Sequence, residues 1–466
     1  MSLTIPNSDD TKKPFGQAET FMRKLTEKDL RTRSFLVGSL GSQLSLGGKP
    51  ELDYFFPERS VKVFIGTWNM AAPKTLPDEI ENFFLPDYAS SNYAAPAPHI
   101  FVFGIQESMS DKRKLQLKIQ ETIGHHFVCL TCNSLGTLTL IVFIRRELIW
   151  YTSAPIEATA STRPPQPIAT KGTLGVSFEL FGNSFLFLNS HFAAGEGNAE
   201  ARIADYRRTI SELNIQSTTY RTPITMAKPS FARSLFQSRR VASATGIAPV
   251  PEESPRRPIS AEQSTIFAAS NASSDITSSF DCCFWMGDFN FRVTKERHHV
   301  NEIIKGFSTT SISSPLEEGS EEKISSTSTF ENLLDHDEMN NEMMRGRLFN
   351  GFQEGRIRFM PTYKFDVGTD NYDTSAKSRI QSYTDRIIYR NRRKNTITCL
   401  AYDSVDNVKT SDHRPLYAVY DVLLKPGLDS IPLGAGQFDR GVYLEGVRNR
   451  THVVSNDKSS AVCSIQ

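Results

Sequence analysis

The chain has 466 residues, of which 39% are hydrophobic and 23% are charged, as is usual for a soluble protein. Its 53 lysine and arginine residues balance 52 acidic residues, which argues against global attraction to nucleic acid or to a membrane. The start of the sequence lacks the apolar core of a signal peptide, and no apolar run approaches the roughly 18 residues of a membrane span. Six cysteines do not make a disulfide framework in so long a chain, so we expect all but Cys463 to be reduced residues of a cytosolic protein.

Residues 1–54 are polar and rich in glycine and serine, which predicts a mobile N-terminal arm. Between residues 55 and 425, short apolar segments recur between loops and helical patterns, and their length and alternation predict β-strands. In chain order these segments are VKVFIGT, HIFVFGI, LTLIVFI, LGVSFEL, SFLFLNS, CCFWMG and PLYAVYDV. Apolar residues on one face predict two amphipathic helices, over 115–123 and 203–213. Residues 55–425 are therefore predicted to form one large α/β domain.

Two stretches of this domain, about 217–279 and 308–329, are rich in serine and threonine and show little periodicity. We expect both to be disordered surface insertions, and without them the core has roughly 290 residues, the size of one large domain. Between residues 221 and 260 the first insertion has seven basic residues against two glutamates, which would suit anionic lipid. A solvated loop with phosphorylation sites is the simpler interpretation.

The segment FWMGDFNFRV is a predicted strand with an unusual polar face. Side chains alternate along a strand, so Phe289 and Phe291 anchor one face and Asp288, Asn290 and Arg292 lie on the other. Burying a carboxylate, an amide and a guanidinium is costly unless they find partners. We therefore expect Asp288 and Asn290 to face a site, and Arg292 to support a neighbouring carboxylate.

Polar residues also occur at the ends of other predicted strands. These residues are Asn69, Glu107, Asn189, His191, Asp385, Arg386, Asp412 and His413. Taken alone, an aspartate near a strand end is usually a turn or cap residue, and a lone histidine is usually a satisfied surface or core residue. Several such residues in one chain, at the positions where α/β folds collect their sites, indicate a common site instead.

The oxygen-bearing members of this set predict a metal and a nucleophile. Glu107, with Asn69 nearby, offers the hard oxygen ligands that suit one Mg²⁺. Asp288 can orient and deprotonate a water molecule, and Asn290 can hold the attacked group or the base.

The basic members predict a site for anionic oxygens. His413 beside Asp385 forms an ion pair that keeps the imidazolium charged, and His191 and Arg386 add positive charge. A metal, histidines and an arginine around a positioned water molecule describe transfer of a phosphoryl group to water.

Seven motifs, in this order, resemble those of the inositol polyphosphate 5-phosphatases, which belong to the endonuclease/exonuclease/phosphatase superfamily. They are GTWNM, GIQE, NSHFAAGE, FWMGDFNFR, PTYKFD, SYTDRI and SDHRP, and they cover about residues 55–425 outside the two insertions. The resemblance implies a DNase I-like four-layer α/β sandwich, in which two packed mixed β-sheets are flanked by helices. It also implies Mg²⁺-dependent removal of the phosphate at position five of an inositol ring.

The resemblance assigns roles to individual residues of these motifs. Glu107 and Asn69 would hold the metal, and Asp288 and Asn290 would position the nucleophilic water. His191 would contact the scissile phosphate. The phosphate at position four would be bound by residues of PTYKFD and of the segment YDTSAKSR. These residues are Tyr363, Lys364, Lys377 and Arg379, and Arg386 is a further candidate for substrate binding.

The catalytic ion pair is the other implied feature: His413, paired with Asp385, would stabilise the developing charge. The sequence departs from the family pattern nearby, because Gln381 stands where proline is normal and would loosen the loop that places Asp385. Tyr383 and Thr384, where tryptophan and cysteine are common, resemble one subgroup, the 5-phosphatase E enzymes.

Residues 426–466 are predicted to be a C-terminal tail that ends in CSIQ, a prenylation box in which Cys463 would be farnesylated. One lipid chain binds membranes reversibly, so a second signal is expected, and Arg448, Arg450 and Lys458 give a modest basic flank. We expect a monomer at the cytoplasmic face of membranes, with a phosphoinositide as substrate, a prenyl-binding carrier protein as partner and no nucleic acid. The resemblance implies the primary cilium and the Golgi.

The sequence leaves three alternative functions to be weighed. A metal-dependent nuclease should carry a basic surface, which the neutral charge balance opposes. A phosphatase of soluble inositol phosphates would read the same ring phosphates, and the lipid anchor is what argues against it. A catalytically inactive membrane adaptor is disfavoured because every acid, amide and histidine of the motifs is present. The expected substrates are PI(4,5)P2 and PI(3,4,5)P3, with PI(3,5)P2 as a further candidate.

Overall fold

The computed structural model describes residues 56–86, 98–162, 171–215, 275–310, 331–425 and 437–450. All of these residues fall within one compact unit of the chain. The predicted N-terminal arm, most of both predicted insertions and the CSIQ box lie outside the described residues. Within the described part, no helix is long and apolar enough to cross a membrane.

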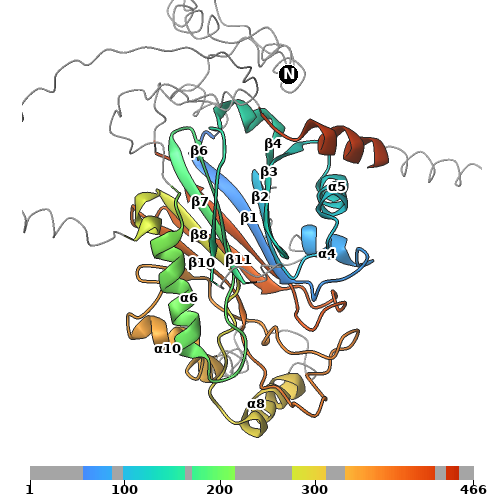
Figure 1. Ribbon diagram of the computed structural model, residues 1–466, viewed down its shortest axis with the longest axis vertical. Helices are drawn as coiled ribbons and strands as arrows, with labels where there is room; N and C mark the ends of the chain where they lie inside the picture. The colour runs from blue at the N-terminus through green and yellow to red at the C-terminus, as the bar shows by residue number, and fades with distance from the viewer. Residues whose placement is uncertain are drawn as a thin grey trace, which may run out of the picture. The chain divides into compact units, whose positions relative to one another are not determined.

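Two six-stranded sheets form the centre of this unit (Figure 1). The first sheet has the order β11-β12-β1-β2-β4-β3, and the second has the order β5-β6-β7-β8-β10-β9. Each is mixed, because β1 and β2 in the first sheet and β7 and β8 in the second run parallel, whereas the other neighbours are antiparallel. The first sheet comprises β1 (Ser60–Asn69), β2 (Ile100–Gln106), β3 (Phe127–Leu135), β4 (Leu138–Arg145), β11 (Ile397–Ser404) and β12 (Leu416–Leu423). The second comprises β5 (Ile156–Ser161), β6 (Gly172–Leu180), β7 (Asn183–His191), β8 (Cys282–Asp288), β9 (Gln353–Glu354) and β10 (Asp385–Asn391).

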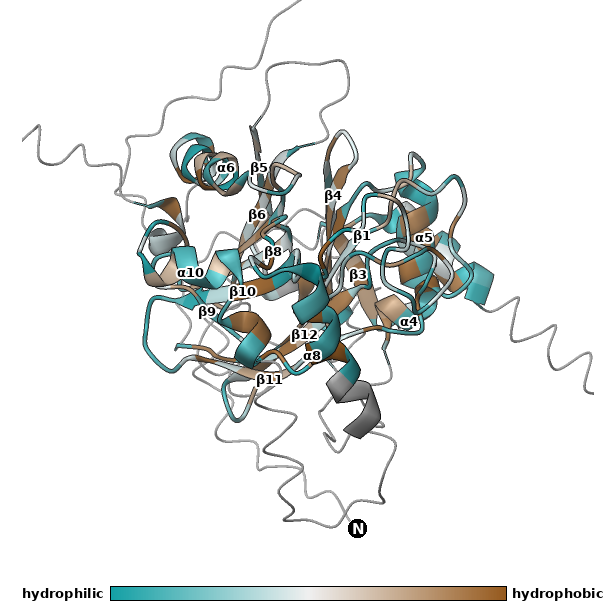
Figure 2. Ribbon diagram, turned by 90° about the horizontal axis from the view of Figure 1, so that it is seen from below, coloured by the Kyte–Doolittle hydropathy of each residue, from teal (hydrophilic) through white to brown (hydrophobic). Residues whose placement is uncertain are grey.

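Four of the described helices cover the outer faces of the two sheets. They are α4 (Ile80–Phe84), α5 (Lys112–Ile123), α6 (Ala199–Glu212) and α10 (Glu338–Met344). A further helix, α8 (Arg297–Thr310), lies below the sheets, and there are short 3-10 turns at η2 (Arg146–Tyr151) and η4 (Ile276–Ser279). Figure 1 shows α4 and α5 beside the first sheet, and α6 and α10 beside the second. In α5, Leu115, Ile119 and Ile123 are buried, and the side chain of Asp111 caps the first turn by accepting from the amide of Lys114. Figure 2 shows the resulting division of α5 into apolar and polar faces.

Three apolar clusters fill the spaces between these layers. The largest lies between the sheets, where Phe284 of β8 packs on Phe187 of β7 and on Tyr420 of β12, at ring-centroid distances of 5.5 Å and 5.0 Å. The second lies between the first sheet and α4 and α5, and the third lies between the second sheet and α6 and α10. This helix–sheet–sheet–helix stacking confirms the predicted four-layer sandwich.

The seven predicted strands are all present, and so is β10, the strand that begins at Asp385, but β3, β5, β9 and β11 were not predicted. These four lie at the edges of their sheets, and edge strands carry half-buried polar residues that weaken the apolar signal. Two predicted boundaries were wrong. Residues 275–279 belong to the domain rather than to an insertion, because η4 buries Thr277. Residues 440–450 form a helix rather than a tail, and its Val442 is fully buried in the cluster under α5.

Candidate active site

Strand register brings five of the predicted site residues together at one end of the two sheets. Asp288, the last residue of β8, is paired with His191 at the end of β7 and with Asp385 at the start of β10. In the first sheet, Asn69 ends β1 and Glu107 directly follows β2. The side-chain amide of Asn69 donates to Oδ2 of Asp288 at 3.0 Å, which joins the two sheets at this point. The predicted convergence of the strand ends is therefore confirmed.

The carboxylate of Asp288 is buried and surrounded by donors. The backbone amide of Asn290 donates to Oδ1 at 3.0 Å, and Nε2 of His191 lies 3.2 Å from Oδ2. Burial opposes ionisation of Asp288, but the hydrogen bond from His191 and the charges of His413 and Lys171 outweigh it and hold the pKa of Asp288 well below its usual range. Asp288 is therefore ionised at any pH at which the protein would work.

His413 and Asp385 form the predicted ion pair, with Nδ1 of His413 lying 2.8 Å from Oδ2 of Asp385. The hydroxyl groups of Thr362 and Thr384 donate to the same oxygen at 2.8 Å and 2.9 Å. Burial alone would lower the pKa of His413, but the negative charge of Asp385 raises it to about 9, so the ring is cationic at neutral pH. One ligand atom each of His413, Asp385 and Asp288 lie within 4.8 Å of one another.

The polar residues that follow Asp288 do not continue the strand, contrary to the prediction. The strand ends at Asp288, and Asn290 has a φ of +59°, a left-handed conformation that turns the chain away from strand geometry. The side chain of Asn290 donates to the carbonyl of Phe192 at 3.2 Å. Arg292 does not support a carboxylate with its guanidinium as expected, because that group donates to Oδ1 of Asn290 at 2.7 Å and lies 4.4 Å from the ring centre of Tyr363. Arg292 thus fixes the orientation of the Asn290 amide.

Gly287 makes room for this arrangement. Its φ is +145°, and a Cβ atom there would lie 2.0 Å from the carbonyl oxygen of Ser190 on β7. Phe289 and Phe291 pack in the third apolar cluster, between the second sheet and the helices α6 and α10. The prediction that these two residues anchor the chain is confirmed. The close approach of β7 and β8 therefore requires glycine immediately before Asp288.

Glu107 and Asn69 are the residues that would hold a hard divalent cation. Glu107 has a φ of +46°, and Nδ2 of Asn69 lies 3.5 Å from its Oε1. Among the described residues, no ion pair balances the charge of the Glu107 carboxylate. A carboxylate without a protein cation fits the preference of Mg²⁺ or Ca²⁺ for oxygen ligands. Asn69 would add its Oδ1 atom, which accepts a hydrogen bond from the backbone amide of Ala71 at 3.1 Å.

The residues predicted to bind substrate lie on one loop, between residues 361 and 382. The ring of Tyr363 packs against that of His413 with centroids 4.5 Å apart. Lys364 forms an ion pair with Asp412. The guanidinium of Arg379 lies 3.3 Å from Oε1 of Glu196, in the turn after β7. Lys377 is exposed.

Arg386 does not belong to this group, so its prediction as a substrate-binding residue was wrong. Side chains alternate along β10, so Arg386 faces away from Asp385 and lies under α10. The guanidinium is fully buried and donates to Asp337 at 2.9 Å, to Asn340 at 3.0 Å and to Glu354. Arg386 is a structural residue between the second sheet and its helices.

Replacing Arg386 with methionine is expected to lower the free energy of unfolding by about 3–5 kcal/mol, because it leaves the buried carboxylate of Asp337 and the partly buried one of Glu354 without a cation. Urea unfolding would measure the loss. Arg356→Met is the matched control, since its ion pair with Glu331 is exposed and should contribute about 1 kcal/mol or less. Equal losses in the two variants would contradict the structural role of Arg386.

Lys171 is a site residue that was not predicted. Its ammonium group contacts Nε2 of His191, because Gly172 at the start of β6 is paired with His191 at the end of β7. An antiparallel pairing of the predicted strands LGVSFEL and SFLFLNS would have placed Lys171 there, but the sequence motif KGT does not show this by itself.

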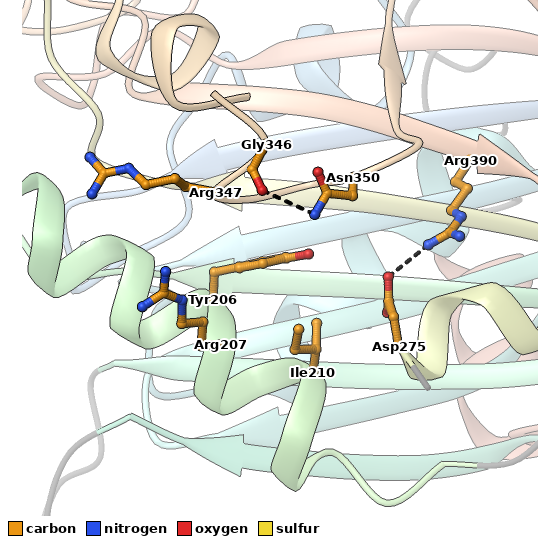
Figure 3. Close-up of a pocket in the computed structure, with 8 residues that line it drawn as sticks. All are labelled: Tyr206, Arg207, Ile210, Asp275, Gly346, Arg347, Asn350 and Arg390. Carbon is orange, nitrogen blue, oxygen red and sulfur yellow. Dashed lines mark hydrogen bonds and ion pairs between the residues drawn. The ribbon is translucent and has the colours of Figure 1, made fainter. Parts of the chain in front are cut away.

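A pocket of 460 Å³ lies elsewhere, on the outer face of the second sheet beside α6 (Figure 3). Two of its three arginines already have partners: Arg390 is bonded to Asp275 at 2.7 Å, and Arg347 is bonded to Glu342 and Glu200. Arg390 is on the same face of β10 as Arg386, away from Asp288. This pocket is therefore not part of the candidate active site.

The family model described as "Endonuclease/Exonuclease/phosphatase family 2" matches residues 66–419, a span that includes every predicted site residue except Cys463. The chain belongs to this family. Curated relatives of this family member include phosphatidylinositol polyphosphate 5-phosphatase type IV of Homo sapiens, which is 37% identical over 96% of this chain. The Mus musculus protein of the same name is 36% identical over the same share, and in each case the chain spans 60% of the relative's length. The predicted resemblance to 5-phosphatases is thus confirmed.

Solved structures show the same fold for this member of the endonuclease/exonuclease/phosphatase family 2. One is the inositol polyphosphate 5-phosphatase domain of SPsynaptojanin, in complex with inositol (1,4)-bisphosphate and calcium ion. It matches with a TM-score of 0.54 and 22% identity, over 88% of this chain and 98% of that domain. A nitrophorin of Cimex also matches, with a TM-score of 0.51 and 18% identity, over 78% of this chain and 99% of the nitrophorin. Since proteins with such different names share the fold, function has to be argued from the site.

Proposed function

We propose that this chain is a divalent-metal-dependent phosphoinositide 5-phosphatase, a phosphoric monoester hydrolase. The observation that carries the proposal is the pairing at the strand ends: an ionised Asp288 stands opposite His413, which Asp385 keeps cationic. Such a site can hold a water molecule on one side of a phosphate and stabilise negative charge on the other. The names of the curated relatives and the SPsynaptojanin domain support the same chemistry.

The nucleophile is a water molecule oriented by Asp288. Because its pKa lies far below neutral, Asp288 is a weak base, and its first task is to accept a hydrogen bond and aim the oxygen at phosphorus. The left-handed backbone at Asn290 places an amide proton on Oδ1, and Asn69 holds Oδ2, so the carboxylate is fixed before substrate binds. Proton transfer to Asp288 then follows as the bond to phosphorus forms.

Three basic side chains face the position of the phosphate. His413 is held charged by Asp385, and His191 and Lys171 lie on the opposite side of Asp288. Their N–H groups can stabilise the charge that develops on the phosphate oxygens and on the leaving oxygen. A divalent cation held by Glu107 and Asn69, for which we propose Mg²⁺, would add positive charge at a phosphate oxygen.

The substrate is proposed to be a phosphoinositide with a phosphate next to the scissile one. Lys364, Lys377 and Arg379 on the 361–382 loop supply donors for a phosphate at position four, and Tyr363 packs between this loop and His413. PI(4,5)P2 and PI(3,4,5)P3 are the proposed substrates, with PI(3,5)P2 as a further one. We further propose that the enzyme is a monomer and that a farnesyl group on Cys463 attaches it to membranes. The proposed membranes are those of the primary cilium and the Golgi, and the proposed partner is a prenyl-binding carrier protein.

Phosphate release from water-soluble dioctanoyl forms of the three lipids tests this proposal. We expect release from PI(4,5)P2 and PI(3,4,5)P3, loss of activity after chelation with EDTA, and recovery on adding Mg²⁺. We expect a lower kcat/KM for inositol 1,4,5-trisphosphate than for dioctanoyl PI(4,5)P2. Release from none of these compounds in the presence of Mg²⁺ would contradict the proposal.

Cys463→Ser is expected to move the full-length protein from membranes to the soluble fraction of cells, because the variant cannot accept a farnesyl group. Fractionation and mass spectrometry of the C-terminal peptide measure the two effects. Cys132→Ser is the control, since this half-buried cysteine lies within the first sheet. An unmodified C-terminal peptide, with unchanged partition of the variant, would refute the farnesyl proposal.

A further inference from the structure

Gln381 occupies the position at which the family resemblance leads one to expect proline. Rather than loosening its loop, the side chain is buried, with 2% of its surface exposed, and Nε2 donates to Oδ1 of Asn301 on α8 at 2.7 Å. The expectation of a looser loop was therefore wrong, because a hydrogen bond to a helix takes the place of a rigid ring.

A second contact joins the same helix to the same loop. The guanidinium of Arg297 donates to the backbone carbonyl of Asp373. Arg297 and Asn301 are four residues apart in α8, so both project from one face of the helix. That face holds the loop at two points, Asp373 and Gln381, and the segment between them includes Lys377 and Arg379.

Asp373 connects this contact to the residues proposed to bind phosphate. Its Oδ2 accepts from the backbone amide of Arg379 at 2.9 Å, and its Oδ1 accepts from that of Ser375 at 3.0 Å. Its own amide donates to the carbonyl of Lys364 at 2.8 Å. Asp373 therefore links both arms of the loop, and Arg297 fixes Asp373 in turn.

The helix itself is held by the core of the protein. Val300 is fully buried, and Ile303 and Ile304 pack against the cluster between the two sheets. Figure 1 shows α8 below the sheets and apart from α6 and α10. Its Arg297–Asn301 face is thus a rigid support for a loop that is otherwise exposed at Lys377.

We propose that the Arg297–Asn301 face of α8 determines substrate specificity by positioning Lys377 and Arg379 for the phosphate at position four of the ring. This inference rests on the proposed function and extends it to a helix outside the site. Arg297 and Asn301 are positioning residues, since they act through the loop. Lys377 and Arg379 would bind a phosphate that does not react, so disturbing them should raise KM and leave kcat nearly unchanged.

Asn301→Ala tests the inference without weakening the helix, because alanine is the better helix former. We expect the ratio of kcat/KM for dioctanoyl PI(4,5)P2 to that for dioctanoyl PI(3,5)P2, which lacks the phosphate at position four, to fall about tenfold. Gln381→Ala should have the same effect, and the double variant should be no worse than either single one, because the two side chains share one hydrogen bond. Glu302→Ala, on the exposed side of the same helix, is the matched control.

Binding of dioctanoyl PI(4)P by calorimetry gives a readout that does not depend on catalysis. The dissociation constant should rise about tenfold in Asn301→Ala and stay unchanged in Glu302→Ala. An unchanged substrate ratio and unchanged PI(4)P affinity in Asn301→Ala would overturn the role of α8. A wild-type protein that binds PI(4)P in this α8-dependent way but hydrolyses no lipid would contradict the proposed function instead.

Discussion

Replacing Asp288 with alanine is expected to lower kcat by about 10³-fold or more, because it removes the group that orients the water and the charge that faces His413. Asp288→Asn should be nearly as inactive, although it keeps the shape of the side chain, since an amide cannot accept the proton of the attacking water. The measurement is the steady-state rate of phosphate release from dioctanoyl PI(4,5)P2, together with a thermal unfolding curve for each variant.

The unfolding curves separate loss of chemistry from loss of fold. Asp288→Ala leaves donors of Asn69 and His191 unpaired, which should cost about 1–3 kcal/mol and leave the protein folded at 25 °C. Asp281→Asn is the matched control, because Asp281 is a buried carboxylate just before β8, at its other end, and pairs with Lys425. This control should lose stability and keep its specific activity. Normal activity of folded Asp288→Ala would remove Asp288 from the mechanism.

Replacing Asp385 with asparagine is expected to change the pH dependence of the reaction as well as its rate. In the wild-type protein, the pKa of His413 is about 9, so activity that needs the imidazolium should be kept at neutral pH and lost as the pH rises through 9. Burial lowers the pKa of His413, and without Asp385 only the charges of Asp288 and Asp412 oppose it, so the pKa should fall from about 9. A smaller share of the ring is then cationic at pH 7.5, and kcat should fall about 100-fold.

Stability should follow the same pKa. A folded-state pKa of about 9 against 6.5 in the unfolded chain stabilises the fold fully below pH 6.5, by about 3 kcal/mol, and this contribution is lost as the pH rises to 9. In Asp385→Asn, the free energy of unfolding should no longer fall over that range. Asp281→Asn should keep the wild-type fall in the free energy of unfolding between pH 6.5 and pH 9. The same fall in Asp385→Asn would show that a group other than His413 controls it.

The sequence predicted the interior of the fold better than its margins. Both faces of β7 and of β8 are buried, so the apolar segments that predict these strands are long and clear. β5, at an edge, alternates between half-buried and exposed residues and gives little signal. The helix over residues 440–450 was missed because its few buried residues, such as Val442, stand among charged ones in a segment that resembles a tail.

Individual site residues could be predicted because most stand at the end of a recognisable strand, and the His413–Asp385 ion pair was predicted as well, but other contacts of the site could not be. Arg386 directly follows Asp385, and only the alternation along β10 shows that it faces the opposite side of the sheet. Lys171 is 20 residues from His191 in the chain and reaches it through strand register. The turn at Asn290 gives no apolar pattern at all, because it depends on one left-handed residue.

The position of the phosphate that is removed tests the central claim most directly. Incubation of wild-type protein and Mg²⁺ with dioctanoyl PI(4,5)P2, followed by chromatography of the deacylated products against standards, identifies the remaining isomer. The site described above predicts PI(4)P as the product, with no such product from Asp288→Ala. Accumulation of PI(5)P, or unchanged substrate with the wild-type protein, would contradict the assignment of this chain as a 5-phosphatase.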